Sequence, residues 1–253
     1  MSETSRVRLA VTLGDPRGIG PEIIAKAIVD ERVRERCELV LIGPSGTELS
    51  VDQVIGNWIT GGDALESARL GGRLAGLAIE HATQMAQRGD VAGIVTAPID
   101  KRALLDGGFD FPGHTEMLAA LTGSHVAMML TSDTLRVVLA TTHIALRDVP
   151  LALTAGAIDG AARVTRDGLR EWYSIAQPRI ALCALNPHGG DGGRFGNEDD
   201  TVLAPAARDA GIAGPFPADT VFVRAMRGEF DAVIAPYHDV GMTAIKVASF
   251  GNA

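Results

Sequence analysis

Short apolar runs rich in Val, Ile and Leu recur along the chain, and longer segments with helical spacing separate them. The runs are continuously apolar rather than alternating, which is typical of strands buried on both faces of a mostly parallel sheet. They lie at 7–14, 38–43, 92–98, 126–130, 135–143, 179–188 and 230–238. Their alternation with helical segments predicts right-handed βαβ crossovers and therefore an α/β fold.

The segments between these runs predict the helices. One helix is expected to begin at Pro21, because proline suits the first helical turn, and residues 64–88 are expected to form a long amphipathic helix. Further helices are predicted at 150–174, 198–210 and 218–228. Segment 44–63 has weak periodicity and is predicted to be a loop. The sequence stops directly after an apolar run that contains Lys246, and no terminal helix is expected to close the layer, so apolar surface of the sheet would stay uncovered.

Composition narrows the classes of protein that this chain can be. Its 253 residues, 46% of them hydrophobic, are enough for one large domain or two modest ones. A net charge of −8 argues against a nucleic-acid binder. Cys37 and Cys183 lie in or beside apolar runs and are expected to be reduced core thiols. The sequence shows no secretory or membrane-spanning run, so a cytoplasmic protein without a membrane partner is expected.

Three of the six histidines occupy the same kind of position. His143, His188 and His238 each end an apolar run and precede a turn. Ligands bind at this carboxyl edge in open α/β sheets, so three imidazoles there predict a metal site with open coordination positions. The alternative is that each histidine only forms hydrogen bonds in its turn. Histidine suits zinc, iron, nickel or cobalt, whereas added carboxylates would admit magnesium or manganese; the candidates for such carboxylates are Asp148, Asp219 and Asp239.

Several loops contain groups that could contact a ligand. The turn at 14–22 is glycine-rich and opens a helix, which favours anions, but it lacks the G-x-G-x-x-G pattern of a standard dinucleotide site. Lys101 ends a strand and could act as a charge partner or proton carrier. His114 or Thr115 could donate to a ligand oxygen, and N-capping is the alternative role for Thr115. Backbone N–H groups of the glycine-rich stretch 186–193 could line a site.

Seven segments, taken in order, resemble the motifs of 4-hydroxythreonine-4-phosphate dehydrogenases. They are GDPRGIGPE, TAPIDK, FPGHTE, ATTHIALRDV, LNPHGGDGG, GPFPADTVF and YHDVGMTAIK, and only about 44–63 lies outside the resemblance. The resemblance implies an isopropylmalate-dehydrogenase-like α/β/α fold with two subdomains flanking a cleft. The first would comprise 1–108 and 239–253, with its C-terminal part missing because family members continue beyond Ala253. The second, metal-binding and dimer-forming, would comprise 109–238.

The resemblance also implies roles for particular residues. The metal ligands would be His143, His188 and His238, with zinc, magnesium or cobalt as the cation. The substrate contacts would be His114, Thr115 and Lys246, the last at the phosphate. Lys101 and Asp219 are the candidates for taking the hydroxyl proton. NAD or NADP would be the cofactor, bound mostly by the missing part, and a homodimer would share the active site between subunits.

The reaction implied is oxidation of the C3 hydroxyl of 4-phosphooxy-L-threonine. Loss of carbon dioxide would then give 3-amino-2-oxopropyl phosphate, in vitamin B6 biosynthesis. The alternatives are a related dehydrogenase acting on 4-phospho-D-threonate, 4-phospho-D-erythronate or a cyclic dihydrodiol dicarboxylate, a metal-dependent hydrolase, and a non-catalytic truncated fragment that binds metal. Asp100 stands where relatives usually carry Asn or His, which adds a charge near Lys101.

Overall fold

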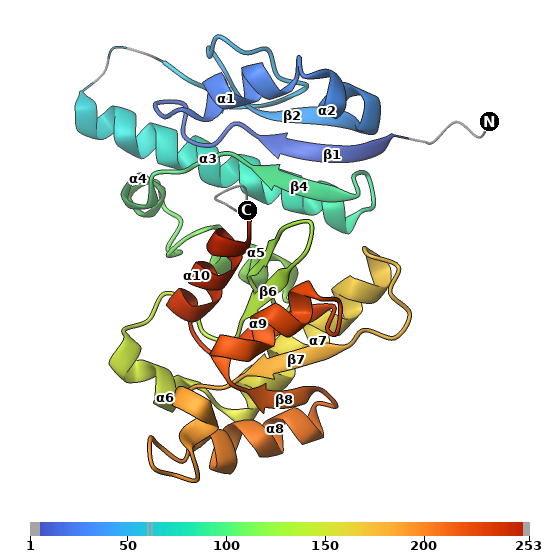
Figure 1. Cartoon of the computed structure of the whole chain (residues 1–253). Coiled ribbons are helices and arrows are strands. Elements are labelled where there is room, and N and C mark those ends of the chain that lie inside the picture. The colour runs from blue at the N-terminus through green and yellow to red at the C-terminus, as the bar shows by residue number, and fades with distance from the viewer. Residues whose placement is uncertain (1–5, 60, 62, 250–253) are drawn as a thin grey trace, which may run out of the picture. The chain divides into compact units, whose positions relative to one another are not determined.

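The computed structural model describes residues 6–59, 61 and 63–249. The chain forms two compact units, Met1–Ser124 and His125–Ala253 (Figure 1). This division falls later than the expected boundary after residue 108, and the described part of 239–253 lies in the second unit. Among the helices described, none combines the length and apolarity needed to cross a membrane.

The first unit is built on a four-stranded parallel sheet in the order β3-β2-β1-β4. Its strands are β1 (Val7–Thr12), β2 (Cys37–Ser45), β3 (Gln53–Asn57) and β4 (Gly93–Thr96). Its helices are α1 (Gly20–Ala27), α2 (Glu31–Arg36), α3 (Ala64–Gln87), α4 (Lys101–Asp106) and α5 (His114–Thr122). The apolar stripe of α3, including Ala78 and Ala82, packs on Ala10 and Ile42 of one face. Helix α1 covers the other face through Ile24.

The second unit has a five-stranded sheet in the order β5-β6-β9-β7-β8, in which only β5 is antiparallel to its neighbour. Its strands are β5 (Met129–Thr131), β6 (Arg136–Leu139), β7 (Ile180–Cys183), β8 (Ala213–Phe216) and β9 (Ala232–Ala235). Its α-helices are α6 (Val149–Ala152), α7 (Ala155–Glu171), α8 (Ala204–Asp209), α9 (Ala218–Met226) and α10 (His238–Ala248). Short turns η1 (Leu146–Asp148), η2 (Pro187–Gly190) and the π-helical η3 (Asp199–Leu203) complete it.

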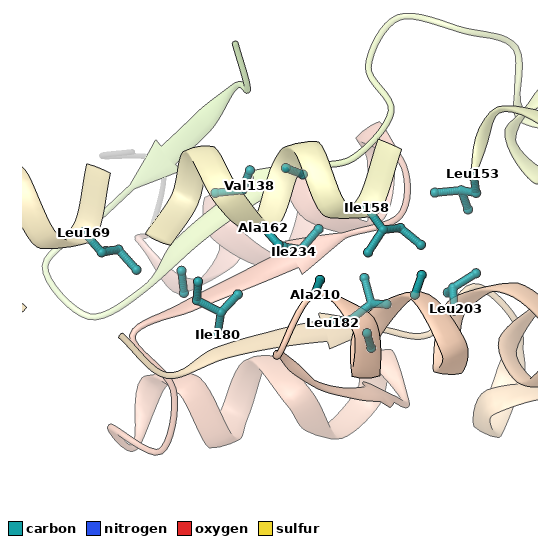
Figure 2. Close-up of a cluster of buried hydrophobic side chains, with 14 of the residues drawn as sticks. Val138, Leu153, Ile158, Ala162, Leu169, Ile180, Leu182, Leu203, Ala210 and Ile234 are labelled. Atoms are coloured by element: carbon teal, nitrogen blue, oxygen red, sulfur yellow. The ribbon is translucent and has the colours of Figure 1, made fainter. Parts of the chain in front are cut away.

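Helices cover both faces of this second sheet. On one face, α7 and α8 pack on β7 and β9, and Figure 2 shows Ile158 and Ala162 of α7 together with Leu182 and Ile234 of the strands in one cluster. On the other face, Phe222 of α9 and other apolar residues of α9 and α10 pack on the same strands. Every residue of β7 and β9 is buried. The prediction that continuously apolar runs form strands buried on both faces is therefore confirmed here.

The predicted helix at 64–88 is confirmed, and Asp63 caps it by accepting from Leu65 N. Two other predicted helices are divided. Asp30 caps a separate α2, so the helix expected after Pro21 becomes two. Thr154 caps α7, which separates it from α6. In both places, a side-chain acceptor placed inside an apolar pattern ends one helix and starts another.

Two sequence predictions are wrong. Segment 44–63 is not all loop, because it contains β3, an edge strand with mostly exposed side chains and hence weak periodicity. The expectation of no terminal helix also fails, because residues 238–248 form α10. Gly241 and Ile245 of α10 are buried, and Gly241 approaches Leu139 and Ala235 so closely that a Cβ there would lie 2.6 Å from Leu139 Cδ2. The segment contains valine, threonine and glycine, which have low helix propensity, so the sequence showed no sign of a helix that tertiary packing stabilises.

Candidate active site

The three histidines predicted as metal ligands follow three neighbouring strands of the second sheet. His143 follows β6, His238 follows β9 and His188 follows β7, and these strands are adjacent and parallel in that order. Their carboxyl ends therefore meet at one edge, and His238 follows the central strand, β9. This is the placement that the positions of the apolar runs predicted.

His143 and His238 lie next to each other. Their ring centroids are 5.3 Å apart and their planes are tilted by 46°. The hydroxyl of Thr141 donates to the carbonyl of Pro236 at 2.7 Å, which ties together the two chain segments that carry these rings. His238 Nδ1 is buried and has no hydrogen-bond partner in the part of the chain that the structure describes. A buried nitrogen without a partner costs free energy unless a further group satisfies it.

His188 is the ligand candidate that follows β7, the strand beside β9. It lines a cavity of about 380 Å³ together with Asn186, Asp219 and Tyr237, and its backbone has φ 55°, in the left-handed region. Among the residues that the structure describes, no group of three or more His, Cys, Asp or Glu side chains is arranged to hold a metal ion. A single chain therefore brings together two of the three predicted ligands and places the third at the next strand end.

The loop that carries His188 is fixed by two acidic residues that the sequence did not single out. The carboxylate of Asp199, which is only 1% exposed, accepts from Leu185 N at 2.8 Å and from Asn186 N at 2.9 Å. Glu198 accepts from the side-chain amide of Asn186 at 2.8 Å, and this hydrogen bond is among the causes that lower the pKa of Glu198, after a hydrogen bond from its own backbone. Acidic residues at a helix start gave no sequence signal that would separate this anchoring role from ordinary capping.

The other candidates of the second unit are exposed. Asp219 lies in the first turn of α9 and lines the cavity of His188 as well as a larger apolar groove of about 690 Å³ between α9 and α10. Lys246 lies in the last turn of α10, at the opposite end from His238. Asp148 faces Arg147 at 3.8 Å, and Asp239 lies in the first turn of α10 and lines the larger groove.

In the first unit, the candidates gather at the carboxyl ends of β1 and β4. These strands are neighbours, and the chain leaves β1 for α1 on one face, whereas it leaves β4 for α4, which packs on α3 of the other face. Such a divergence is the usual ligand position in open α/β sheets. Lys101, the first residue of α4, is exposed there. The N-cap of α4 is Asp100, which accepts from Arg102 N and Ala103 N.

His114 and Thr115 begin α5, and Gly113 is its N-cap. Thr115 is therefore inside the first turn, and the alternative that it serves as N-cap is wrong. His114 Nε2 is buried and has no hydrogen-bond partner within the described residues. Burial, and next the positive charge of Lys101, lower the pKa of His114. The neutral imidazole is thus favoured, with one nitrogen left for a ligand.

Comparisons with known proteins agree on one family. The model of the family described as pyridoxal phosphate biosynthetic protein PdxA matches residues 28–253. A Bradyrhizobium diazoefficiens protein, provisionally named D-threonate 4-phosphate dehydrogenase, is 41% identical over 98% of this chain and 81% of its own length. A 4-hydroxythreonine-4-phosphate dehydrogenase of Beijerinckia indica is 40% identical over 94% of this chain and 80% of that protein.

A solved structure gives the same answer. The crystal structure of 4-hydroxythreonine-4-phosphate dehydrogenase from Klebsiella pneumoniae matches with a TM-score of 0.85 and 35% identity, covering 99% of this chain and 85% of that one. The fold is accordingly of the isopropylmalate-dehydrogenase-like α/β type, as the sequence predicted. The chain belongs to the PdxA family of pyridoxal phosphate biosynthetic proteins, whose members compared here are dehydrogenases.

Proposed function

We propose that this protein is a metal- and NAD(P)-dependent dehydrogenase that oxidises and decarboxylates 4-phosphooxy-L-threonine to 3-amino-2-oxopropyl phosphate. The observation that carries the proposal is the row of His143, His238 and His188 behind three adjacent parallel strands. Relatives named for phosphorylated four-carbon substrates support the substrate class.

The residues fit a divalent cation in their chemistry. Two imidazoles lie 5.3 Å apart by ring centroids, and one buried nitrogen of His238 lacks a partner. Imidazole suits zinc or cobalt, and nearby carboxylates would also admit magnesium. Within the described residues, one chain does not gather three ligands, and we propose that the site is completed in a homodimer, with His188 contributed at a shared site. A cation held by these imidazoles would supply Lewis-acid chemistry, lowering the pKa of the substrate hydroxyl and stabilising the new carbonyl, and NAD or NADP would supply the hydride acceptor.

The remaining work falls to side chains of the chain itself. His114, neutral because burial lowers its pKa, and Thr115 would donate to or accept from substrate oxygens at the start of α5. Lys246 would pair with the phosphate, which an acidic protein otherwise repels. Lys101 or Asp219 would accept the proton that leaves the hydroxyl. The β-keto acid then loses its carboxylate as carbon dioxide, and a proton is added to C2, the carbon that had carried the carboxylate.

The experiment is NAD(P)H production at 340 nm by the full chain, with zinc, cobalt or magnesium added. We expect turnover with 4-phosphooxy-L-threonine, and we expect that His143→Ala, His188→Ala and His238→Ala each lose metal while their circular dichroism stays unchanged. Metal content that is unchanged in all three variants would refute the site. Phosphate release without NAD(P)H would indicate a hydrolase instead, and metal binding without turnover would indicate a non-catalytic fragment.

A second candidate substrate is 4-phospho-D-threonate, favoured by the name of the Bradyrhizobium relative. The two substrates share the phosphate and the C3 hydroxyl, and differ in the amino or hydroxyl group at C2. No described residue decides between them by charge alone, so the ratio of kcat/KM for the two substrates is the measurement that assigns the activity.

A further inference from the structure

An ion pair between the buried carboxylate of Asp15 and the partly exposed side chain of Arg17 lies in the turn between β1 and α1. Asp15, only 3% exposed, accepts from Arg17 through both carboxylate oxygens, at 3.1 Å from Nε to Oδ1 and at 2.6 Å from Nη2 to Oδ2. Arg17 N also donates to Asp15 Oδ1 at 2.9 Å. The guanidinium is thus held in a fixed, two-pronged geometry, and lysine could not reproduce it.

Arg17 also reaches a second turn. Its Nη2 donates to Asp100 Oδ2 at 3.4 Å, although the two residues are 83 positions apart in sequence. Asp100 uses its other oxygen to cap α4, accepting from Arg102 N at 2.9 Å and Ala103 N at 3.0 Å. Arg17 therefore connects the turn after β1 with the turn after β4, at the place where the chain leaves the sheet toward opposite faces.

The residue that follows Asp100 is Lys101. A Cβ built on Gly113 would lie 3.8 Å from Lys101 Cε, so the lysine side chain extends toward the start of α5. The charge of Lys101 contributes to the lowered pKa of His114, after burial. The position of the lysine amine relative to His114 thus depends on how the turn at Asp100 is held.

An anion-binding role for Arg17 fits these observations poorly. Two carboxylates already face its single positive charge, so the three groups together carry −1. The hydrogen bond that Arg17 donates to Asp15 is the largest cause that raises the pKa of Arg17, and the charge of Asp100 adds to it. A cation compensated on two sides attracts a phosphorylated substrate weakly, whereas a cation held at both ends fixes distances well.

We propose that Arg17 is a positioning residue. By donating hydrogen bonds to both Asp15 and Asp100, it joins the turn after β1 to the turn after β4 and so sets the location of Lys101. The role of Lys101 in proton transfer rests on the proposed function. The position of the lysine itself does not, and it can be measured separately.

The chain contains its own matched control. Asp30 and Arg32 repeat the Asp-x-Arg geometry, with 2.9 Å from Arg32 N to Oδ1, 3.0 Å from Nε to Oδ1 and 2.7 Å from Nη2 to Oδ2. Arg32 is 83% exposed and makes no salt bridge to a further carboxylate among the described residues. Arg32→Lys therefore removes the same local fork without touching a second turn.

The test compares Arg17→Lys, Asp100→Asn and Arg32→Lys in the full chain. The sequence has only three lysines, Lys26, Lys101 and Lys246, so reductive methylation with ¹³C-formaldehyde gives few and assignable NMR signals. We expect the Lys101 signal to shift in Asp100→Asn, in which asparagine still caps α4 but carries no charge for Arg17. The Lys26 signal, whose amine pairs with Glu22 at 2.6 Å, should stay in place.

In turnover, Arg17→Lys should lower kcat by about 10- to 100-fold, as expected for a small misplacement of a reacting group, and Asp100→Asn, which introduces a residue that relatives carry at this position, should lower it less. KM should change by less than about twofold, and Arg32→Lys should change neither. The proposal is overturned if the Lys101 signal is the same in Asp100→Asn as in the parent, or if kcat falls equally in Arg32→Lys. A wild-type chain without NAD(P)H production, but with a Lys101 signal that shifts, would refute the proposed function and leave the positioning role supported. If Arg17→Lys does not fold, Asp100→Asn alone decides.

Discussion

The carboxyl edges of the two sheets differ in how far their polar groups find hydrogen-bond partners within the described chain. In the first unit, Asp15, Arg17 and Asp100 hydrogen-bond to one another, so the positive charge of Arg17 at this edge is already compensated. In the second unit, two imidazoles lie side by side and His238 Nδ1 has no partner among the described residues. A compensated edge is suited to positioning, whereas an edge with unsatisfied nitrogens is suited to binding a ligand.

His114 refines this comparison. It stands in the first unit but resembles the histidines of the second, because its Nε2 is buried without a partner in the described chain. The first unit therefore combines a charged frame, formed by Asp15, Arg17 and Asp100, with one polar nitrogen, His114 Nε2, that has no partner in the described chain. Both units carry function at the same edge, and they differ in how much of that edge the chain itself satisfies.

The largest effect is expected from Arg17→Ala, which removes the partner of a buried carboxylate. Breaking a fully buried pair on one side costs about 3–5 kcal/mol. Asp15 is only 3% exposed but the side chain of Arg17 is 29% exposed, so we expect the lower end, about 3 kcal/mol. Urea denaturation should show this loss of unfolding free energy, and Arg32→Ala in the exposed copy of the motif should cost far less. The double variant Asp15→Ala/Arg17→Ala should recover part of the loss. An equal loss of stability in Arg17→Ala and Arg32→Ala would mean that the Asp15–Arg17 pair contributes no more than the exposed Asp30–Arg32 pair.

A smaller loss is expected from Asp199→Ala, which frees the loop that holds His188. The change deletes a buried acceptor of the backbone N–H groups of Leu185 and Asn186, and we expect a cost of about 2–3 kcal/mol. Asp199→Asn keeps one acceptor oxygen and should cost less. Calorimetric melting with and without metal is the measurement. A loss of stability with no change in metal affinity would mean that this anchor serves the fold and not the site.

Thr141→Val should have the next largest effect. It removes the hydroxyl that donates to the Pro236 carbonyl at 2.7 Å and leaves that buried carbonyl without this donor. We expect about 1 kcal/mol of lost stability, together with weaker metal binding, because this bond joins the segments of His143 and His238. Thr131→Val, at an exposed strand position, is the control. Tighter or unchanged metal binding in Thr141→Val would show that the histidine pair does not depend on the link.

The sequence predicted which residues lie at the strand ends, but it did not predict which strands are neighbours or which side chains pair. The three strand-end histidines were found because continuous apolar runs mark buried parallel strands, and the carboxyl ends of such strands share an edge. Which strands are neighbours depends on the order β6-β9-β7. That order places His238 between the other two, although it comes last in the chain.

The charged frame of the first unit could not be predicted in the same way. Asp15-x-Arg17 and Asp30-x-Arg32 have the same local pattern and nearly the same hydrogen bonds. Only tertiary structure buries the carboxylate of Asp15 and brings Asp100 to Arg17 from 83 positions away. Helix α10 illustrates the same limit, because packing of Ile245 and Gly241 on the sheet, rather than helix propensity, decides its conformation.

The smallest predicted effect is a pH dependence that sharpens the place of His114 in the comparison. Burial first, and the Lys101 charge second, lower the pKa of His114 below its ordinary value of 6.5. The unfolded chain then binds a proton more readily, so stability is lost as the pH falls through that region and is fully present above it. His114→Gln should flatten this part of the dependence in urea midpoints measured at about pH 5 and about pH 8. His81→Gln, on α3, is the control, because His81 is not among the buried unpartnered groups of the described chain. If the dependence of stability on pH is unchanged in His114→Gln, the fold does not hold this imidazole neutral. His114 would then no longer contrast with the charged frame of Asp15, Arg17 and Asp100 in the first unit.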